Sequence, residues 1–329
     1  MRSLLSALCL TAASFGSPAS AQVMHQYTAA DVSDAALVKR LPGFSEGSVT
    51  VAGNRLHYVS GGTGSPVLLL PGWPQTWWAY HKIMPELARS HRVIAIDIRG
   101  MGASGKPAAG YDKKTMASDI AGIVKALKLG KVDVVGHDIG SMVAYSFAAN
   151  HSDLTRKIVL LDVAPPDASL AKWPLLPGVN TFGDKVGDGS HAYAWWFAYH
   201  QVPDLHVKMA EGGRIRLEQD WFFHYLLKDD ASVDPLDRDV FAAAYNSPAA
   251  IRAGDGWYQA FPQDILDDEG YAPLQMPVLA LGGPGYAWLA SVLPSKAKNL
   301  KVVRIEDSGH FIPDEVPEEL LHHLGEFLD

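Results

Sequence analysis

The chain of 329 residues contains a single cysteine, Cys9. Residues 1–21 have the features of a secretory signal, because Arg2 lies near the start, a short apolar stretch follows, and small residues precede Gln22. Cleavage at that point would leave no cysteine, so we expect neither disulfide bonds nor a zinc site built from thiolates. The sequence therefore predicts an exported protein, periplasmic or secreted, that is stabilised by its core.

Positive charge is also scarce. The chain has 28 Lys and Arg against 36 Asp and Glu, a net charge of −8 that becomes −9 when Arg2 leaves with the signal. There is no basic stripe interleaved with aromatic residues, so no nucleic-acid partner is expected. Beyond the signal, no apolar run is long enough to span a bilayer, so no membrane anchor is expected.

Two further patterns are too weak to predict a cofactor or a metal. Gly100, Gly102 and Gly105 have the spacing of a dinucleotide-binding loop, but Pro107 interrupts the helix that such a site needs. The adjacent pair His137 and Asp138 follows a strand and lacks the helical context and further ligands of a metal site. We therefore expect no cofactor and no metal.

Apolar runs that alternate with helical patterns indicate a mostly parallel sheet. A hairpin is expected within residues 43–60, with its turn at Gly53-Asn54. Further strands are expected over residues 66–70, 91–96, 131–136, 156–162, 276–282 and 300–306. Helices are expected over residues 77–90, 112–129, 139–150 and 317–328.

This alternation stops between residues 164 and 264. The segment holds 16 of the 32 aromatic residues and contains no strand pattern of the kind seen before and after it. It therefore predicts a helical insertion between two parts of one core, residues 44–163 and 265–329. Its composition favours a substrate pocket with apolar walls and few polar groups.

The most informative stretch is Gly136-His137-Asp138-Ile139-Gly140, which ends an apolar run. Glycines two residues on either side of a central residue are typical of a nucleophile elbow, in which a strand reverses sharply into a helix. A carboxylate at the centre suits attack on a saturated, polarised carbon, after which water releases the ester. Asp138 is therefore the expected nucleophile.

Through this elbow and the turn Pro71-Gly72-Trp73-Pro74, residues 48–329 resemble α/β-hydrolases with a helical cap. The resemblance is to the branch with an aspartate nucleophile, which contains epoxide hydrolases and dehalogenases, and especially to exported Cif-type epoxide hydrolases. It implies an α/β fold with a mostly parallel central sheet, helices on both faces and the cap over residues 164–264.

The resemblance also implies roles for individual residues. His310, in the loop after the last strand, would be the general base. Asp162 would be the acid that orients it, because no carboxylate follows the strand at 276–282. The backbone N–H groups of Trp73 and Ile139 would form the oxyanion hole.

The cap supplies the remaining residues that the resemblance implies. Tyr258 would donate a proton to the opened epoxide oxygen, and Trp196 stands where a second donor, tyrosine or histidine, is usual. An indole N–H can donate a hydrogen bond but does not transfer its proton. Trp196, Phe197, Tyr199 and His137 are expected to bind the substrate.

Three functions remain open. Epoxide hydrolysis through an ester of Asp138 is favoured, with a small apolar epoxide and water as reactants. A haloalkane or haloacid dehalogenase would use the same nucleophile; Trp196 suits a bound halide, whereas Ile139 stands where such enzymes usually carry another tryptophan. A ligand-binding protein without catalysis is the third alternative. A homo-oligomer is possible.

Overall fold

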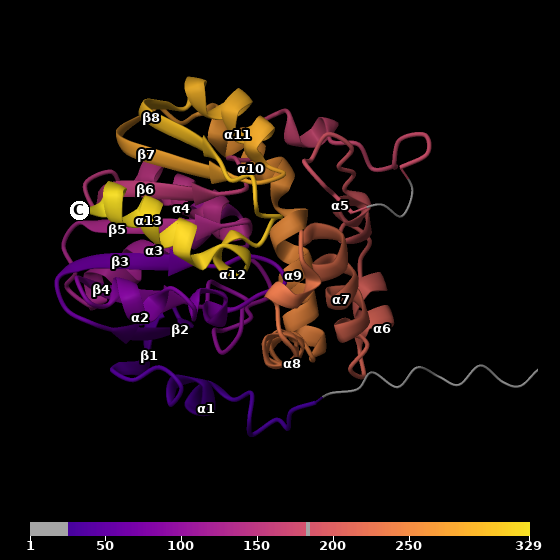
Figure 1. The fold of residues 1–329 in the computed structure, drawn as a ribbon, viewed down its shortest axis with the longest axis horizontal. Coiled ribbons are helices and arrows are strands. Elements are labelled where there is room, and N and C mark those ends of the chain that lie inside the picture. The colour runs from indigo at the N-terminus through magenta and orange to yellow at the C-terminus, as the bar shows by residue number, and fades with distance from the viewer. Residues whose placement is uncertain (1–25, 182–184) are drawn as a thin grey trace, which may run out of the picture.

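The computed structural model describes residues 26–181 and 185–329, so the predicted signal in residues 1–21 lies outside the described residues. The described strands form one sheet in the order β1-β2-β4-β3-β5-β6-β7-β8 (Figure 1). Only the pairs β1/β2 and β2/β4 are antiparallel. The strands are β1 Phe44–Val51, β2 Asn54–Gly61, β3 Ser65–Leu70, β4 His91–Ile96, β5 Val132–His137, β6 Thr155–Leu161, β7 Leu274–Gly282 and β8 Ala297–Arg304.

Helices cover both faces of this sheet. One face packs against α3 (Lys113–Ala126), α4 (Ile139–Asn150) and α11 (Tyr286–Val292), the last of which leads into the short 3₁₀ helix η4 (Leu293–Ser295). The other face packs against α1 (Asp34–Val38), η1 (Trp77–Tyr80), α2 (Met84–Leu87), α12 (Ile312–Glu315) and α13 (Pro317–Leu328). The predicted fold class is confirmed.

The side chains of the central strands explain this layered arrangement. In β3, Leu68 and Leu70 contribute to the core on the α3 and α4 side, whereas Val67 and Leu69 contribute to the core on the other side. All four are fully buried. A parallel strand covered on both faces reads as a continuous apolar run, which is why these strands could be located in the sequence.

Two predicted local structures differ in detail. Val51 pairs with Asn54, so the hairpin turn consists of Ala52 and Gly53, one residue earlier than expected. Their φ angles of 48° and 82° are the positive values that a type I′ turn requires. The helix expected over residues 77–90 is divided into η1 and α2, because Pro85 cannot donate the backbone hydrogen bond of a continuous helix.

All elements that the structure describes between β6 and β7 are helical. They are η2 Leu170–Lys172, α5 Trp195–Tyr199, α6 Leu205–Ala210, α7 Ile215–Leu226, η3 Asp230–Ser232, α8 Pro235–Ala244, α9 Pro248–Gln259 and α10 Phe261–Glu269. We call this segment the helical insertion. Since α10 crosses residue 264, the insertion continues beyond the boundary expected there.

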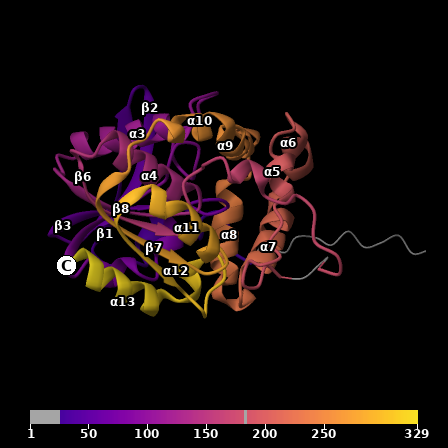
Figure 2. The ribbon, with the colours of Figure 1, turned by 90° about the horizontal axis from the view of Figure 1, so that it is seen from above.

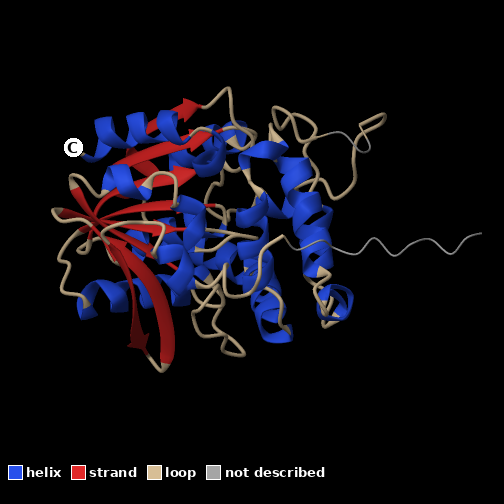
Figure 3. Cartoon of the chain, turned by 60° about the horizontal axis from the view of Figure 1, so that its bottom comes forward, coloured by secondary structure: helices blue, strands red, loops and turns tan. Residues whose placement is uncertain are grey.

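The helical insertion forms a layer of its own beside the sheet. Helices α5 to α9 lie on one side of the molecule and the strands on the other (Figures 1 and 2). The same separation is clear between the strands and the insertion's helices in Figure 3. In the described part of the chain, no helix has the length and apolar character needed to cross a membrane.

Candidate active site

Asp138 occupies the turn between β5 and α4. Its φ of 53° and ψ of −122° lie in a region that residues with a side chain rarely adopt. Strained backbone of this kind persists only where the surrounding structure enforces it, and it is common at functional sites. The expected elbow is therefore present, and it holds the Asp138 side chain away from both the strand and the helix.

Two glycines allow this turn to pack closely. A Cβ atom on Gly140 would lie 2.0 Å from the carbonyl oxygen of Leu70, so α4 can meet the end of β3 only without a side chain there. A Cβ atom on Gly72 would lie 2.3 Å from Oδ1 of Asp138. These close approaches bring the turn at residues 71–74 directly against the carboxylate.

The Asp138 carboxylate is held by a backbone hydrogen bond on one side and by an imidazole on the other. The Trp73 N–H donates to Oδ1 at 2.7 Å, and the Ile139 backbone amide helps to lower the pKa of this carboxyl group. The other oxygen, Oδ2, lies 3.6 Å from Nε2 of His310. The carboxylate therefore presents Oδ1 to the Trp73 amide and Oδ2 to the imidazole.

His310 is held from behind by Asp162. Its Nδ1 lies 2.7 Å from Oδ2 of Asp162, whose Oδ1 accepts a hydrogen bond of 2.8 Å from the Gly285 N–H. Asp162 directly follows β6 and has a φ of 60°. The side chains of Asp138, His310 and Asp162 thus lie in contact in that order, and Asp162 is in turn bound by the segment that follows β7.

Burial and pairing decide the charges in this chain. Burial lowers the pKa of His310, but the close carboxylate of Asp138, the hydrogen bond to Asp162 and the charges of both outweigh it and raise the value to about 10. Burial opposes ionisation of Asp138, yet His310 and the Ile139 amide lower its pKa overall. The resting site is therefore a His310 imidazolium between two carboxyl groups, with Asp138 ionised.

A cavity of about 80 Å³ opens in front of Asp138. Of the residues expected at the site, it is lined by Trp73, Asp138, Ile139, Asp162, Trp196, Phe197, Tyr258 and His310. Its other walls are Met142, Val163, Trp173, Val186, Ala192, Phe222, Tyr225, Leu226, Phe261, Pro284, Gly285 and Trp288. Among these described lining residues none is Lys or Arg, so the cavity offers an anionic substrate no opposite charge from a lysine or arginine.

His137 and Tyr199 do not line this cavity. His137 is fully buried, with Nε2 2.8 Å from the His310 carbonyl oxygen; burial, and then the charge of His310, lower its pKa to about 3. The Tyr199 ring centroid lies 5.0 Å from that of His206. His137 therefore supports His310 and Tyr199 packs against His206, and contact of either residue with substrate stays a prediction.

Tyr258 reaches the cavity from α9. Its side chain is 3% exposed, and burial raises its pKa well above the usual value, so the phenol keeps its proton. Its ring stacks on that of His200 at 4.2 Å between centroids. The Tyr258 backbone oxygen accepts a hydrogen bond of 2.9 Å from Gln201 Nε2, which ties α9 to the end of α5.

A buried polar network supports this stack. Oδ1 of Asp255 lies 2.8 Å from Nδ1 of His200 and 2.6 Å from Nδ1 of His206. Nε2 of His206 lies 2.9 Å from Glu218. Burial lowers the pKa of His206, but hydrogen bonds to Asp255 and Glu218 raise it to about 9. The network connects α5, α6, α7 and α9 beneath the Tyr258 ring.

Sequence reasoning missed a second phenol in the cavity. Tyr225, on α7, accepts a hydrogen bond of 3.3 Å from the Tyr193 N–H at its own oxygen, which leaves its proton available. Its ring centroid lies 6.2 Å from that of Trp196. Phe222 and Tyr225 recur at helical spacing on α7, and this periodicity was the signal that could have placed them on one face.

Comparison with known proteins agrees with this geometry. Residues 65–197 match the model of the alpha/beta hydrolase fold. The soluble epoxide hydrolase of Corynebacterium sp. (strain C12) is 31% identical over 290 residues, which cover 82% of this chain and 91% of that protein. The chain belongs to the α/β-hydrolase family. This membership identifies the protein as a hydrolase.

Two further similarities bear on the branch of the family. A fluoroacetate dehalogenase from Burkholderia sp. is 26% identical over 87% of this chain and 94% of that protein. The Cif epoxide hydrolase from Acinetobacter nosocomialis superposes with a TM-score of 0.79 at 23% identity, covering 88% of this chain and 90% of that one. The expected likeness to epoxide hydrolases and dehalogenases is confirmed, and the likeness to Cif is one of fold.

Proposed function

We propose that this α/β-hydrolase opens small apolar epoxides to vicinal diols through a covalent ester of Asp138. The observation that carries the proposal is the protonated phenol of Tyr258 in the same apolar cavity as Asp138 and His310. Opening an epoxide requires a proton donor at the ring oxygen, whereas a departing halide requires none. The similarity to the Corynebacterium epoxide hydrolase supports this choice.

In the first step Oδ2 of Asp138 attacks an epoxide carbon. The new C–O bond forms as the ring C–O bond breaks, and the ring oxygen takes the proton of Tyr258. Oδ1 becomes the carbonyl oxygen of the ester while it remains on the Trp73 amide, 2.7 Å away. The substrate needs no charge of its own for this step, in keeping with the apolar walls.

Once the ester has formed, the His310 imidazolium passes its proton to the Tyr258 phenolate, which restores the phenol and leaves a neutral imidazole. In the second step this imidazole removes a proton from water, and the hydroxide adds to Cγ of the ester. The N–H groups of Trp73 and Ile139 stabilise the negative charge that develops on Oδ1. Collapse of the adduct expels the diol oxygen, which takes the proton of the added hydroxyl group. His310 keeps the proton taken from water and is again the resting imidazolium, so the sum is epoxide plus water to diol.

The electrostatics explain how one histidine serves both steps. In the resting site Asp138 is an anion and helps to hold the pKa of His310 at about 10. Ester formation neutralises Asp138, which removes that contribution and leaves the imidazole with Asp162 alone. The pKa of His310 then falls, and the imidazole becomes a base only once the ester is in place.

The decisive experiment is His310→Gln followed by intact-mass measurement after addition of styrene oxide or 1-bromobutane. We expect an adduct with the full mass of the epoxide, because a glutamine side chain cannot activate the water that releases the ester. The double variant with Asp138→Asn should form none. A wild-type protein that makes diol while His310→Gln forms no adduct would contradict the covalent route.

Dehalogenation is the second candidate, because Trp196 lines the cavity and the fluoroacetate dehalogenase is a relative. The apolar Ile139 and Met142 beside the nucleophile argue against a haloacid, whose carboxylate would need a cation. Release of bromide from 1-bromobutane by the wild type, without diol from any epoxide, would replace the first proposal with this one.

We also propose that the protein is exported, since residues 1–21 carry a signal pattern. Expression of the full chain in a Gram-negative host, followed by osmotic shock and N-terminal sequencing, should recover a periplasmic protein that begins at Gln22. Uncleaved protein in the cytoplasm would contradict export.

A further inference from the structure

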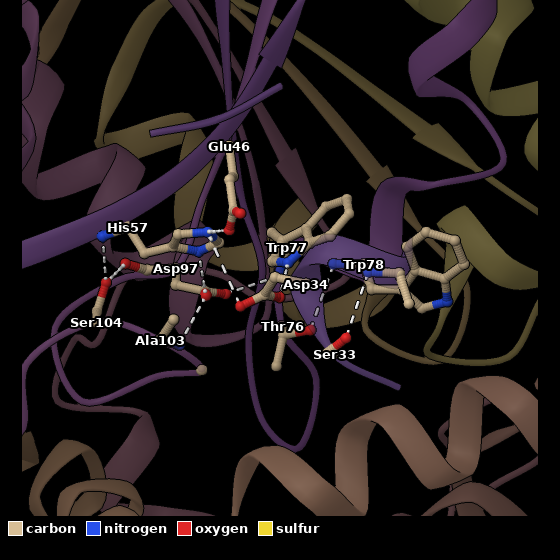
Figure 4. Close-up of polar contacts among 12 residues, drawn as sticks. Ser33, Asp34, Glu46, His57, Thr76, Trp77, Trp78, Asp97, Ala103 and Ser104 are labelled. Carbon is tan, nitrogen blue, oxygen red and sulfur yellow. Dashed lines mark hydrogen bonds and ion pairs between the residues drawn. The ribbon is translucent and has the colours of Figure 1, made fainter. Parts of the chain in front are cut away.

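Three side chains of the types that bind metals meet away from the catalytic cavity. Asp34 is the first residue of α1, Glu46 lies on β1 and His57 lies on β2. Nε2 of His57 is 3.7 Å from Oε2 of Glu46 and 3.9 Å from Oδ2 of Asp34. Figure 4 shows both carboxylates turned towards this one ring nitrogen. These separations are too long for hydrogen bonds.

The His57 ring is buried with one nitrogen unsatisfied. The residue is 1% exposed, and Nε2 has no hydrogen-bond partner among the described residues. Nδ1 lies 2.9 Å from Oδ2 of Asp97 (Figure 4), and this contact places the hydrogen of a neutral ring on Nδ1. The lone pair of Nε2 then faces two carboxylates, so three electron-rich groups meet without a cation between them.

The neighbours orient these groups as the outer shell of a metal site does. Metal-binding histidines commonly donate their other N–H to a carboxylate, which fixes the ring, and ligating carboxylates are hydrogen-bonded in turn. Here Asp97 holds His57, and Oδ1 of Asp34 accepts a hydrogen bond of 2.7 Å from Trp77 Nε1. The Trp77 backbone N–H donates to Asp97 at 2.9 Å.

No basic side chain fills the space between the carboxylates. Among the described residues, His57 is the only ion-pair partner of Asp34 and of Glu46. The Lys106 ammonium group donates instead to the backbone oxygens of Gly102 and Ser104, at 2.6 and 3.0 Å. The site thus combines two carboxylates and an imidazole lone pair without a lysine or arginine between them.

We propose that Asp34, Glu46 and His57 bind a divalent cation, with zinc the best match. Zinc lies about 2.0–2.2 Å from nitrogen and oxygen ligands in a tetrahedral site, so its ligands are roughly 3.4 Å apart. The observed 3.7 and 3.9 Å need a closure of a few tenths of an ångström. Glu46, with its side chain 49% exposed, can supply that movement, and water takes the fourth position.

Zinc fits better than a harder cation. Calcium requires six to eight oxygen ligands, and magnesium keeps several waters and prefers carboxylates to imidazole. One imidazole with two carboxylates is a ligand set that zinc accepts. The ion would link α1 to the first two strands, so its role is to fix the N-terminal segment rather than to take part in hydrolysis.

No sequence motif marks this site, which is why no metal was expected. The three ligands come from a helix and two strands, and their spacing follows no metal-binding pattern. They meet only because β1 and β2 form a hairpin against which α1 packs. A proton on Nε2 of His57 competes with the metal ion for this place. Burial lowers the pKa of His57, but Asp97, Asp34 and Glu46 together raise it.

The test uses the mature protein after dialysis against EDTA. Zinc is added in a calorimetric titration, and the metal retained after gel filtration is measured by mass spectrometry. We expect about one zinc per chain, and a rise of about 3–8 °C in the unfolding temperature at saturating zinc. Cobalt should give the visible absorption bands of a four-coordinate ion.

Asp34→Asn and Glu46→Gln keep the shape of each ligand while removing its charge. Each should weaken zinc binding at least 10-fold, whereas Glu86→Gln, an exposed carboxylate on α2, should leave it unchanged. Hydrolysis at 25 °C should be the same with and without zinc. Lack of stoichiometric binding by the wild type, or wild-type affinity in Glu46→Gln, would overturn the proposal; the latter would place the zinc elsewhere.

Discussion

The elbow and the helical insertion line the same cavity, but they fix their side chains by different means. At the elbow, the backbone holds the Asp138 side chain: Asp138 has a constrained φ of 53°, and its carboxylate accepts a hydrogen bond from the Trp73 amide. In the insertion, side chains hold side chains, as in the stack of Tyr258 on His200. The first arrangement tolerates little change, and the second allows the cavity to be remodelled.

This difference in anchoring assigns two parts of the proposed reaction to two regions: the covalent chemistry to the elbow, and the choice of leaving group to the helical insertion. In the proposed mechanism, attack, water activation and charge stabilisation all depend on residues anchored at strand ends. The proton donor and the walls come from α5, α7 and α9, where their positions depend on packing over long sequence distances. Substitutions in the two regions should therefore have distinguishable effects on activity and on stability.

The largest effect is expected at the elbow. Asp138→Asn should lower kcat/KM for an epoxide by about 10⁴-fold or more, because an amide cannot form the ester. Diol formation in a stopped assay measures this loss, and circular dichroism checks that the fold is kept. Activity within tenfold of the wild type would show that the elbow does not supply the nucleophile.

The next largest effect is expected in the insertion. Tyr258→Phe should lower kcat for epoxides about 10²–10³-fold, since it removes the proton donor but keeps the ring. Tyr225→Phe is the matched variant, and its smaller loss, about tenfold or less, would mark Tyr225 as an assisting donor. Equal losses in the two variants would mean that the phenols share the proton transfer.

Part of the site was predictable because its signals are local. The elbow pattern located Asp138, and the resemblance to α/β-hydrolases implied Asp162 and His310 after strand ends, where parallel strands bring their carboxyl ends to one edge of the sheet. The insertion offered composition and the resemblance, which implied Tyr258 but missed Tyr225, and Tyr199, expected to bind substrate, does not line the cavity. Which face of a short helix points inward depends on the helices around it, and no local pattern records that.

Close packing at the elbow predicts a stability effect. Gly140→Ala should lower the free energy of unfolding by about 2–3 kcal/mol, because its Cβ would lie 2.0 Å from the Leu70 carbonyl oxygen. Gly325→Ala in α13, where a Cβ meets nothing within 4 Å, should raise it by up to about 1 kcal/mol. Urea denaturation measures both, and equal effects would contradict the close approach.

The charges around His310 predict how stability depends on pH. Its pKa of about 10 in the folded chain lies above its unfolded value near 6.5, so the folded state binds the extra proton between these values. The resulting stabilisation is complete below pH 6.5 and is lost as the pH rises through 10, by at most about 5 kcal/mol in all. His310→Gln should flatten this part of the curve.

The smallest effect on epoxides is expected from Trp196→Phe, which keeps an aromatic wall and removes the indole N–H. If the phenols supply the proton, kcat/KM for an epoxide should change less than about fivefold. A bound halide would lose a hydrogen bond to a charged group, so any bromide release should fall roughly 10–100-fold. Trp195→Phe, on the same helix but outside the cavity lining, serves as the control. A selective loss of bromide release would show that Trp196 serves the leaving group in dehalogenation, whereas a large loss on epoxides would assign the indole to ring opening beside Tyr258.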